Sequence, residues 1–404
     1  MFPKEDVHYI RELAAELKNI SQNPVHGENI VRWKNHNSLK DDRPMVFVHP
    51  DGAWNELLPW GSLLCSDNVL KGIEYQIRQK IIRAKYVKDD VPIIGEIIVR
   101  KIIHNSMWGI RAQVKHSDEP NGAWSYVPII EKASDWEKLS FPVIEYDEHS
   151  TQKIFDEIAD CFGDMLPVRL AGVTNFSFHL MHWYCDYRGL DNMLADLYDE
   201  PEMVHFVMRF FADGIKHMLA QYEKLDLISP NSDDTFHYTG GLGYTDELPN
   251  KKQGLKLSDV WGAAEAQEFS CVSPEMHEEF VLQYERGILQ YFGLNGYGCC
   301  DDLSRKLNNV LKIKNLRRIA VCPWADIAEF TPVLKKDYIM TWKPQPAHLA
   351  YDKMDEHAIY TELSEGIKKA EGGILELILR DTHTCKNEPE RFNKWISIAR
   401  KAIN

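Results

Sequence analysis

The stretch LNGYGCCDDLSRKLNNVLKIKNLRRIAVC, residues 294–322, contains the pattern that decides the fold. It starts with a short apolar segment, 294–298, that reads as a strand. The apolar residues between Leu303 and Leu311 then recur at helical spacing, and Asp301 can cap the start of that helix. A second strand follows at 317–322. A strand, a helix and a strand in this order predict two parallel strands joined by a crossover helix.

The same alternation continues to the end of the chain. Strands are predicted at 337–342 and 374–381, with helices at 356–371 and 389–403. Four earlier strand candidates, 45–49, 168–173, 226–230 and 255–261, bring the number of strands to eight. Eight strands predict an α/β chain folded as a (β/α)8 TIM barrel with an N-terminal extension. Residues 1–160 would form the extension and the first barrel strand, and residues 161–404 the remainder of the barrel.

Composition narrows the class of protein. The chain has 404 residues and a formal net charge of -14, with no long block of either sign, so neither nucleic acid nor a membrane surface is an expected partner. The N-terminal segment predicts an amphipathic helix and not a signal peptide, which places the protein in the cytoplasm. In that compartment thiols stay reduced, and the eight cysteines are expected as core residues, metal ligands or nucleophiles. Neither GxGxxG nor GxxxxGK[ST] occurs, so the usual marks of a nucleotide-binding sheet are missing.

Chemically capable residues follow the predicted strands. In a (β/α)8 barrel the active site lies at the carboxyl ends of the strands. The residues expected there are His49, Asp51, Asp233, Asp234, His237, Glu265, Gln267, Glu268, Cys299, Cys300, Trp324, Asp326, His383 and Cys385. An aromatic group that includes Trp183 is a candidate for the wall of a substrate pocket, or simply for core packing.

The cysteines among these residues predict a zinc-binding site. Zn²⁺ prefers sulfur donors with a nitrogen or oxygen donor, and three protein ligands leave a fourth position for substrate. Cys300 and Cys385 are the first candidates, and His383, Glu268 or Glu265 would supply the third ligand. Since adjacent strand residues point in opposite directions, Cys299 joins Cys300 on one ion only if the chain turns between them. The alternative is that both cysteines are buried core residues.

Several segments resemble the uroporphyrinogen decarboxylase superfamily, in order and from about residue 30 to the end. They include RPMVFVHPDGAWNELLP, VRLAGVTNFSFHLMHWYCDYRGLDNMLADLYDEPEMV, GGLGYTDELP, NGYGCCDDL, NLRRIAVCPWADI and LRDTHTCKNEPER. More narrowly, the chain looks like the cobalamin (corrinoid)-dependent methyltransferases of anaerobes. The resemblance implies a (β/α)8 barrel and a zinc site with a His-x-Cys pair and a late Cys. Cys300 and Cys385 match the two cysteines, but Gly298 stands at the His position, which leaves Cys299, Glu268 or His383 as substitutes.

The resemblance also implies a function. We expect a zinc-dependent methyltransferase that moves a methyl group from a small methylated compound, an O-methyl compound in the first place, to the Co(I) corrinoid of a partner protein. Asp326, His237 and Glu268 are the candidate proton donors, and His49, Trp183, Tyr244 and Trp324 the candidate substrate contacts. A second hypothesis is a metal-free decarboxylase or lyase on the same barrel, with Arg169 and Arg188 as candidate carboxylate ligands. A third is a non-catalytic partner of a corrinoid protein. The stretch VFVHPDGAWNELLP contains no arginine, which disfavours tetrapyrrole decarboxylation.

Overall fold

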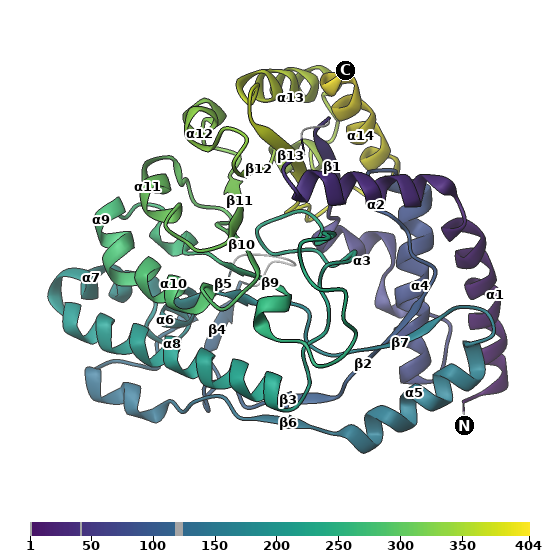
Figure 1. The fold of residues 1–404 in the computed structure, drawn as a ribbon, viewed down its shortest axis with the longest axis horizontal. Helices are drawn as coiled ribbons and strands as arrows, with labels where there is room; N and C mark the ends of the chain where they lie inside the picture. The colour runs from purple at the N-terminus through teal and green to yellow at the C-terminus, as the bar shows by residue number, and fades with distance from the viewer. Residues whose placement is uncertain (1, 41–42, 118–123) are drawn as a thin grey trace.

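A parallel sheet of seven strands forms the centre of the molecule (Figure 1). The computed structural model describes residues 2–40, 43–117 and 124–404. The strands of this sheet are β1 (Met45–Val48), β8 (Ser177–Phe178), β9 (Trp261–Ala264), β10 (Leu294–Tyr297), β11 (Leu316–Val321), β12 (Ile339–Trp342) and β13 (Ile374–Leu379). Their order is β1-β13-β12-β11-β10-β9-β8, so the first strand pairs with the last, Val46 opposite Leu377.

The sequence of these strands explains their place. In β1, β9, β10, β12 and β13 every residue is buried, as expected for parallel strands covered on both faces. The prediction of an α/β chain with parallel strands is therefore confirmed. Two predicted strands were misplaced. Residues 257–259 form a short 3-10 turn and β9 starts only at Trp261, while 226–230 contributes a single bridge, Ile228 to Val173.

The described pairings do not close a barrel. β2 (Ile97–Arg100) pairs with β7 (Val168–Ala171) as a separate parallel pair, and β8 is only two residues long. The ladder changes partner at Gly172, where a Cβ atom would lie 2.0 Å from the carbonyl oxygen of Leu227, so only glycine lets these backbones meet. The structure thus shows an open parallel sheet beside a two-stranded pair, and closure into eight strands stays a prediction.

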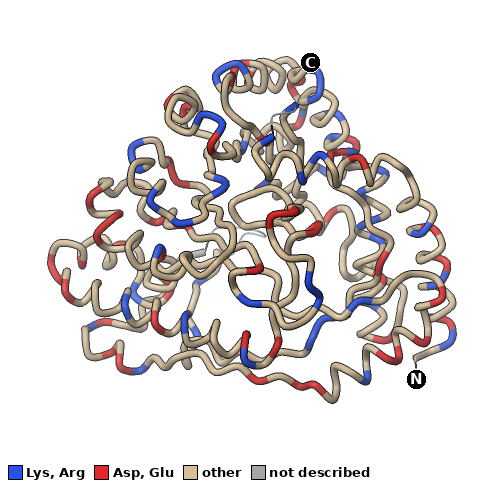
Figure 2. The backbone as a smooth tube through the Cα atoms, viewed as in Figure 1, with Lys and Arg blue, Asp and Glu red and all other residues tan. Residues whose placement is uncertain are grey.

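Helices pack around the strands. They are α1 (Lys4–Ser21), α2 (Pro24–Asn37), α3 (Trp54–Leu57), α4 (Asn68–Tyr86), α5 (Glu148–Phe162), α6 (Leu180–Arg188), α7 (Leu190–Asp199), α8 (Pro201–Lys224), α9 (Pro274–His277), α10 (Gln283–Leu289), α11 (Leu307–Val310), α12 (Ile327–Leu334), α13 (Glu356–Lys369) and α14 (Glu390–Ile403). Both signs of charge are spread along the whole trace (Figure 2). None of the helices in the described ranges combines the length and apolar composition that a membrane span needs.

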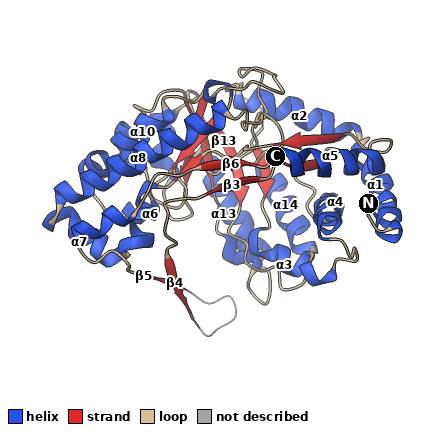
Figure 3. Ribbon diagram, turned by 90° about the horizontal axis from the view of Figure 1, so that it is seen from below, coloured by secondary structure: helices blue, strands red, loops and turns tan. Residues whose placement is uncertain are grey.

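The N-terminal helices have a core of their own. Apolar residues of α1, α4, α5 and β2, among them Leu17, Ile77, Ile97 and Phe162, form a cluster separate from the larger core of the main sheet. The predicted boundary at 160/161 falls inside α5. Two short antiparallel pairs complete the chain: β3 (Ile103–Asn105) with β6 (Ile144–Tyr146), and β4 (Gln113–His116) with β5 (Trp124–Val127). The β4–β5 pair projects from the body of the molecule (Figure 3).

Candidate active site

A pair of thiols and two cations meet where β10, β12 and β13 end. Cys299 and Cys300 follow β10, Lys343 follows β12 and Arg380 follows β13. The Lys343 ammonium donates to the carbonyl oxygen of Cys299 at 2.9 Å and lies 3.3 Å from its Sγ, and Arg380 Nη1 lies 4.0 Å from the same sulfur. Cys299 and Lys343 are each 2% exposed, so these charges interact with little screening by water.

The turn after β10 brings the two thiols together. Gly298 has φ +90°, and a Cβ atom there would lie 2.5 Å from Leu303 Cδ1. This left-handed residue bends the chain, so that the Cys299 and Cys300 sulfurs lie 3.4 Å apart instead of on opposite faces of a strand. The condition for both sulfurs to share one site is met.

The environment favours a thiolate at Cys299. The hydrogen bond from the Cys300 thiol, together with Lys343 and Arg380, lowers the pKa of Cys299 to about 5 despite its burial. The hydrogen bond to Cys299 and burial raise the pKa of Cys300. The pair therefore holds one proton, on Cys300, and one negative charge, on Cys299.

A histidine and a glutamate extend this cluster towards β8 and β9. His179 Nδ1 lies 2.6 Å from Glu265 Oε1, and its Nε2 lies 2.8 Å from the hydroxyl of Ser177. The His179 ring contacts the ring of Tyr238 edge-on, with centroids 4.3 Å apart. Arg380 also contacts Tyr238: it donates to the Tyr238 carbonyl oxygen at 3.0 Å, and its guanidinium lies 5.4 Å from the Tyr238 ring centre. Tyr238 therefore connects His179 with Arg380. We call Tyr238, His179, Glu265, Cys299, Cys300, Lys343 and Arg380 the thiol cluster.

A second histidine–glutamate pair, His182 and Glu268, lies near Glu265. His182 Nδ1 lies 3.0 Å from Glu268 Oε1 and 3.1 Å from the hydroxyl of Tyr126. The hydrogen bond to Glu268 raises the pKa of His182. Burial raises the pKa of Glu265, and the Glu268 carboxylate adds to that rise. Glu268 thus lies beside the thiol cluster and favours the charged form of a neighbouring histidine.

His49 and Asp51 border Arg380 at the end of β1. His49 Nδ1 lies 2.7 Å from Asp51 Oδ1, and Asp51 Oδ2 accepts the backbone N–H of Asp381 at 2.6 Å. Burial alone would raise the pKa of Asp51, but the His49 hydrogen bond and the Arg380 charge hold it below the ordinary value. These contacts tie the ends of β1 and β13 together.

Cys385 lies in a different environment. Its thiol lies 3.2 Å from Glu56 Oε2, which also accepts the backbone N–H groups of Cys385 and Asn387 at 2.9 Å. Burial and this carboxylate raise the pKa of Cys385 to about 12, so the thiol stays protonated. His383, two residues before it, is exposed.

The donor set does not fit a three-ligand zinc site as arranged. Within the described ranges no group of three or more His, Cys, Asp and Glu side chains lies close enough to hold a metal ion. Two sulfurs are adjacent, but Lys343 and Arg380 already pair with one of them, Cys385 donates to Glu56, and Glu268 accepts from His182. We therefore derive no step through zinc.

The side chains of the other predicted catalytic residues, Asp326 and His237, pair with groups outside the thiol cluster. Asp326 caps α12 and pairs with Lys369 at 3.1 Å, and Trp324 beside it is 65% exposed; both line a surface pocket of about 330 Å³. His237 is buried against the Trp261 ring, with Nε2 3.1 Å from the Asn231 carbonyl oxygen. Burial lowers the pKa of His237 to about 3, so it is a neutral structural residue.

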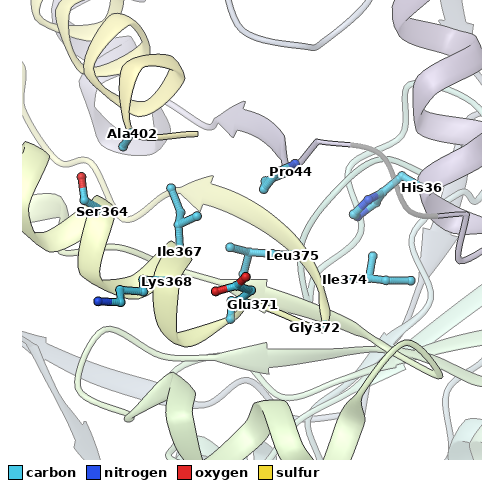
Figure 4. Close-up of a pocket in the computed structure, with 12 residues that line it drawn as sticks. His36, Pro44, Ser364, Ile367, Lys368, Glu371, Gly372, Ile374, Leu375 and Ala402 are labelled. Atoms are coloured by element: carbon cyan, nitrogen blue, oxygen red, sulfur yellow. The ribbon is translucent and has the colours of Figure 1, made fainter. Parts of the chain in front are cut away.

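The two remaining predicted substrate contacts are part of apolar clusters. Trp183 packs edge-on against Trp108, with ring centroids 5.0 Å apart. Tyr244 is buried with Trp33 and Phe47 and lines a pocket that contains none of the thiol-cluster residues. A further pocket of about 380 Å³, which includes His36, Pro44 and Ile374, lies at the amino ends of β1 and β13 and holds none of the predicted site residues (Figure 4).

Sequence reasoning missed Lys343, Arg380, His179 and Tyr238. Lys343 directly follows a predicted strand, so the rule that found Cys300 also selects it. Arg380 fell inside the predicted strand 374–381, because β13 ends two residues earlier than predicted, at Leu379. His179 follows β8, which is too short to recognise in the sequence. Tyr238 lies in a loop, and no local sequence pattern indicates that this loop contacts the strand ends. Comparison of the chain with protein-family models and with curated proteins gives no match.

Proposed function

We propose that this protein is a methyltransferase that moves a methyl group from a small O-methyl compound to the Co(I) corrinoid of a partner protein. The proposal rests on the ordered resemblance to corrinoid-dependent methyltransferases of the uroporphyrinogen decarboxylase superfamily. The observation that carries it is the thiol cluster: the cysteine of the NGYGCCDDL segment lies at the carboxyl ends of parallel strands, among cations and a histidine–glutamate pair. A distorted (β/α)8 barrel belongs to the same proposal.

The cations of the cluster suit a leaving oxygen. When the methyl–oxygen bond breaks, the oxygen keeps the electron pair and becomes an alkoxide or phenolate. Lys343 has three N–H groups, of which Cys299 takes two. The Nε of Arg380 lies 3.5 Å from Asp381 Oδ1 and makes no hydrogen bond within the described residues. Donors held in place near a developing oxyanion are worth about 3–4 kcal/mol each when they are buried. The His179–Glu265 pair can then deliver the proton that the oxygen takes up.

The test is methyl transfer from a panel of O-methyl compounds with a corrinoid protein in the Co(I) state. We expect transfer by the wild type, none without the corrinoid protein, and a loss of about a hundredfold in Lys343→Met. Lys335→Met, on a surface turn after α12, is the matched control. Methyl transfer without any corrinoid protein, or full activity in Lys343→Met, would contradict the proposal.

Zinc remains a prediction that metal analysis checks directly. If this chain has the zinc site that the resemblance implies, the anaerobically purified wild type contains about one zinc per chain, and Cys300→Ser loses that zinc. That result would require Cys385 to leave Glu56. Absence of zinc in both proteins would support the arrangement of donors described above.

The second candidate is the metal-free lyase or decarboxylase. Arg169 and Arg188, the arginines first considered, are already paired with Glu96 and Asp196. Lys343 and Arg380 instead place two cations at the carboxyl ends of the neighbouring strands β12 and β13, where they could bind a substrate carboxylate. This function predicts CO2 release that survives Cys299→Ser with Cys300→Ser and is lost in Arg380→Gln. Loss of CO2 release in the double cysteine variant would exclude it.

A further inference from the structure

A pocket of about 610 Å³, lined by both charged and apolar residues, lies outside the candidate active site. Helix α2, the residues at the amino ends of β2 and β7, and the segment 230–252 line it. None of its lining residues belongs to the thiol cluster. It contains Asp233 and Asp234, the adjacent aspartates that the sequence placed at a strand end and that the proposed function does not use.

Most charges of this pocket are already paired. Arg169 forms a bidentate pair with Glu96, with N–O distances of 3.0 and 2.8 Å, and reaches Asp233 at 3.5 Å. Asp233 also accepts the backbone N–H of Thr235 at 3.0 Å. At the rim, Lys34 pairs with Asp246 at 2.7 Å.

Asp234 is different from these residues. In the part of the chain that the structure describes, no hydrogen bond or ion pair reaches its carboxylate. Lys80 and Arg169 both lower the pKa of Asp234 through their charge, yet the Lys80 ammonium donates to the carbonyl oxygens of Ile94, at 2.9 Å, and Glu96, at 3.3 Å. The Asp234 side chain is partly buried and lines the cavity, so its carboxylate is open to a ligand in that space.

The walls of the pocket are apolar. Ile30, Ile94, Leu248 and the ring of Tyr244 face the same space as Asp234. We propose that this pocket binds a small organic ammonium compound, whose cation pairs with Asp234 and whose apolar body lies against these side chains. An aromatic ring beside a carboxylate is a common setting for an amine or quaternary ammonium group.

The electrostatics of the pocket agree with this assignment. Burial and the neighbouring Asp233 raise the pKa of Asp234 to about 6. A bound cation would offset both effects, because it would pair directly with the carboxylate, whereas Lys80 and Arg169 act on it only through their charge.

Calorimetric titration of the full chain with n-pentylammonium tests the site. We expect millimolar or tighter binding to the wild type at pH 7.5, and about tenfold weaker binding to Asp234→Asn, the loss expected for one charge-assisted contact. Asp246→Asn is the matched control: it makes the same change in net charge at the same pocket, but its carboxylate is already paired with Lys34. Binding to this control should stay within about threefold of the wild type.

Neutral and anionic analogues complete the test. 1-Pentanol and pentanoate fill the same volume without a positive charge, so they should bind the wild type at least about tenfold more weakly than n-pentylammonium. Equal binding of 1-pentanol would overturn the proposal, as would equal losses in both variants or no binding of n-pentylammonium to the wild type. The wild-type comparison stands even if Asp234→Asn does not fold.

Discussion

At the scale of single residues, carboxylates do much of the positioning. Glu56 illustrates this role, because it accepts three contacts from the loop after β13: two backbone N–H groups and the Cys385 thiol, besides the hydroxyl of Thr384. A residue on a four-residue helix after the first strand thus fixes the loop after the last strand. Sequence reasoning selected Cys385 as a metal ligand, and its described partner is this carboxylate.

Glu56→Gln should lower stability at neutral pH. Burial raises the pKa of Glu56, but its hydrogen bonds outweigh burial and hold the pKa below the ordinary value of 4.5. A lowered pKa gives stability that is present above the unfolded value and lost as pH falls through the folded one. We expect a loss of about 1–3 kcal/mol at pH 7, shrinking below pH 4.5, measured by urea unfolding. Glu16→Gln, exposed on α1, should change the free energy of unfolding little at either pH. An equal loss of stability in Glu16→Gln would contradict this prediction.

Asp234→Asn should have the opposite effect on stability. The pKa of Asp234 is raised to about 6, so the folded chain binds the proton more tightly than the unfolded one, whose value is near 3.8. Stability is therefore full below pH 3.8 and falls as pH rises through about 6. At pH 7 the variant should be more stable, by at most about 3 kcal/mol. Thermal unfolding at pH 5 and pH 7 checks this, and a less stable variant at pH 7 would show that the carboxylate has a structural partner.

At the scale of elements, the turn after β10 decides the geometry of the site. Gly298 and Gly372 have nearly the same φ, +90° and +93°. A Cβ atom at Gly298 would meet Leu303, whereas a Cβ atom at Gly372 would have no neighbour within 4 Å among the described residues. The two positions therefore separate the strain of a left-handed backbone from a steric clash.

Gly298→Ala should cost more than Gly372→Ala. In both variants the left-handed backbone lowers the free energy of unfolding by about 1–2 kcal/mol, and only Gly298→Ala must also displace Leu303. Urea unfolding measures the difference, which we expect to exceed about 1 kcal/mol. A thiol titration should also show altered reactivity of the Cys299–Cys300 pair in Gly298→Ala alone. Equal costs at both positions would mean that Leu303 moves aside freely.

The elements that were predicted correctly are those with strong local patterns. Strands β10, β11 and β13 contain apolar stretches, so periodicity sufficed for them. The helix between β10 and β11 is shorter than predicted: α11 spans only Leu307–Val310, and Lys306, not Asp301, stands at its N-cap. β9 was misplaced because VW at 260–261 continues an apolar run that begins in a 3-10 turn. In the site, adjacency to a strand end selected Cys299, Cys300 and Glu265. The partners that define their chemistry, Lys343, Arg380 and Tyr238, depend on which strands and loops become neighbours, and that is a property of the tertiary structure.

At the scale of the whole molecule, helix α2 joins distant parts of the chain. Asn37, fully buried, donates to the carbonyl oxygens of Leu242 and Tyr244 at 2.8 and 2.7 Å and accepts from Arg318 of β11. Its own carbonyl oxygen accepts from Arg317. One side chain and its backbone thus hold the loop at 240–244 and the sheet against the N-terminal helices.

Asn37→Ala should loosen this junction. The carbonyl oxygens of Leu242 and Tyr244 would lose their donor, and Arg318 an acceptor, so we expect a loss of about 2–4 kcal/mol. Hydrogen exchange should accelerate at the amides of residues 240–244. Asn35→Ala, two residues earlier on the same helix and only partly buried, is the control and should leave that exchange unchanged. Unchanged exchange in Asn37→Ala would place the restraint elsewhere.

The pairing of β1 with β13 bears on how the protein is made. Met45 opposes Glu376, so the first strand of the sheet acquires that neighbour only after more than 300 further residues have been synthesised. At roughly 5–20 residues per second, the ribosome needs on the order of 15 to 65 s for that interval. Throughout it the apolar segment MVFV stays without its hydrogen-bonding partner, and in that form it is prone to associate with other chains. A chaperone that binds nascent MVFV would prevent such association until β13 emerges.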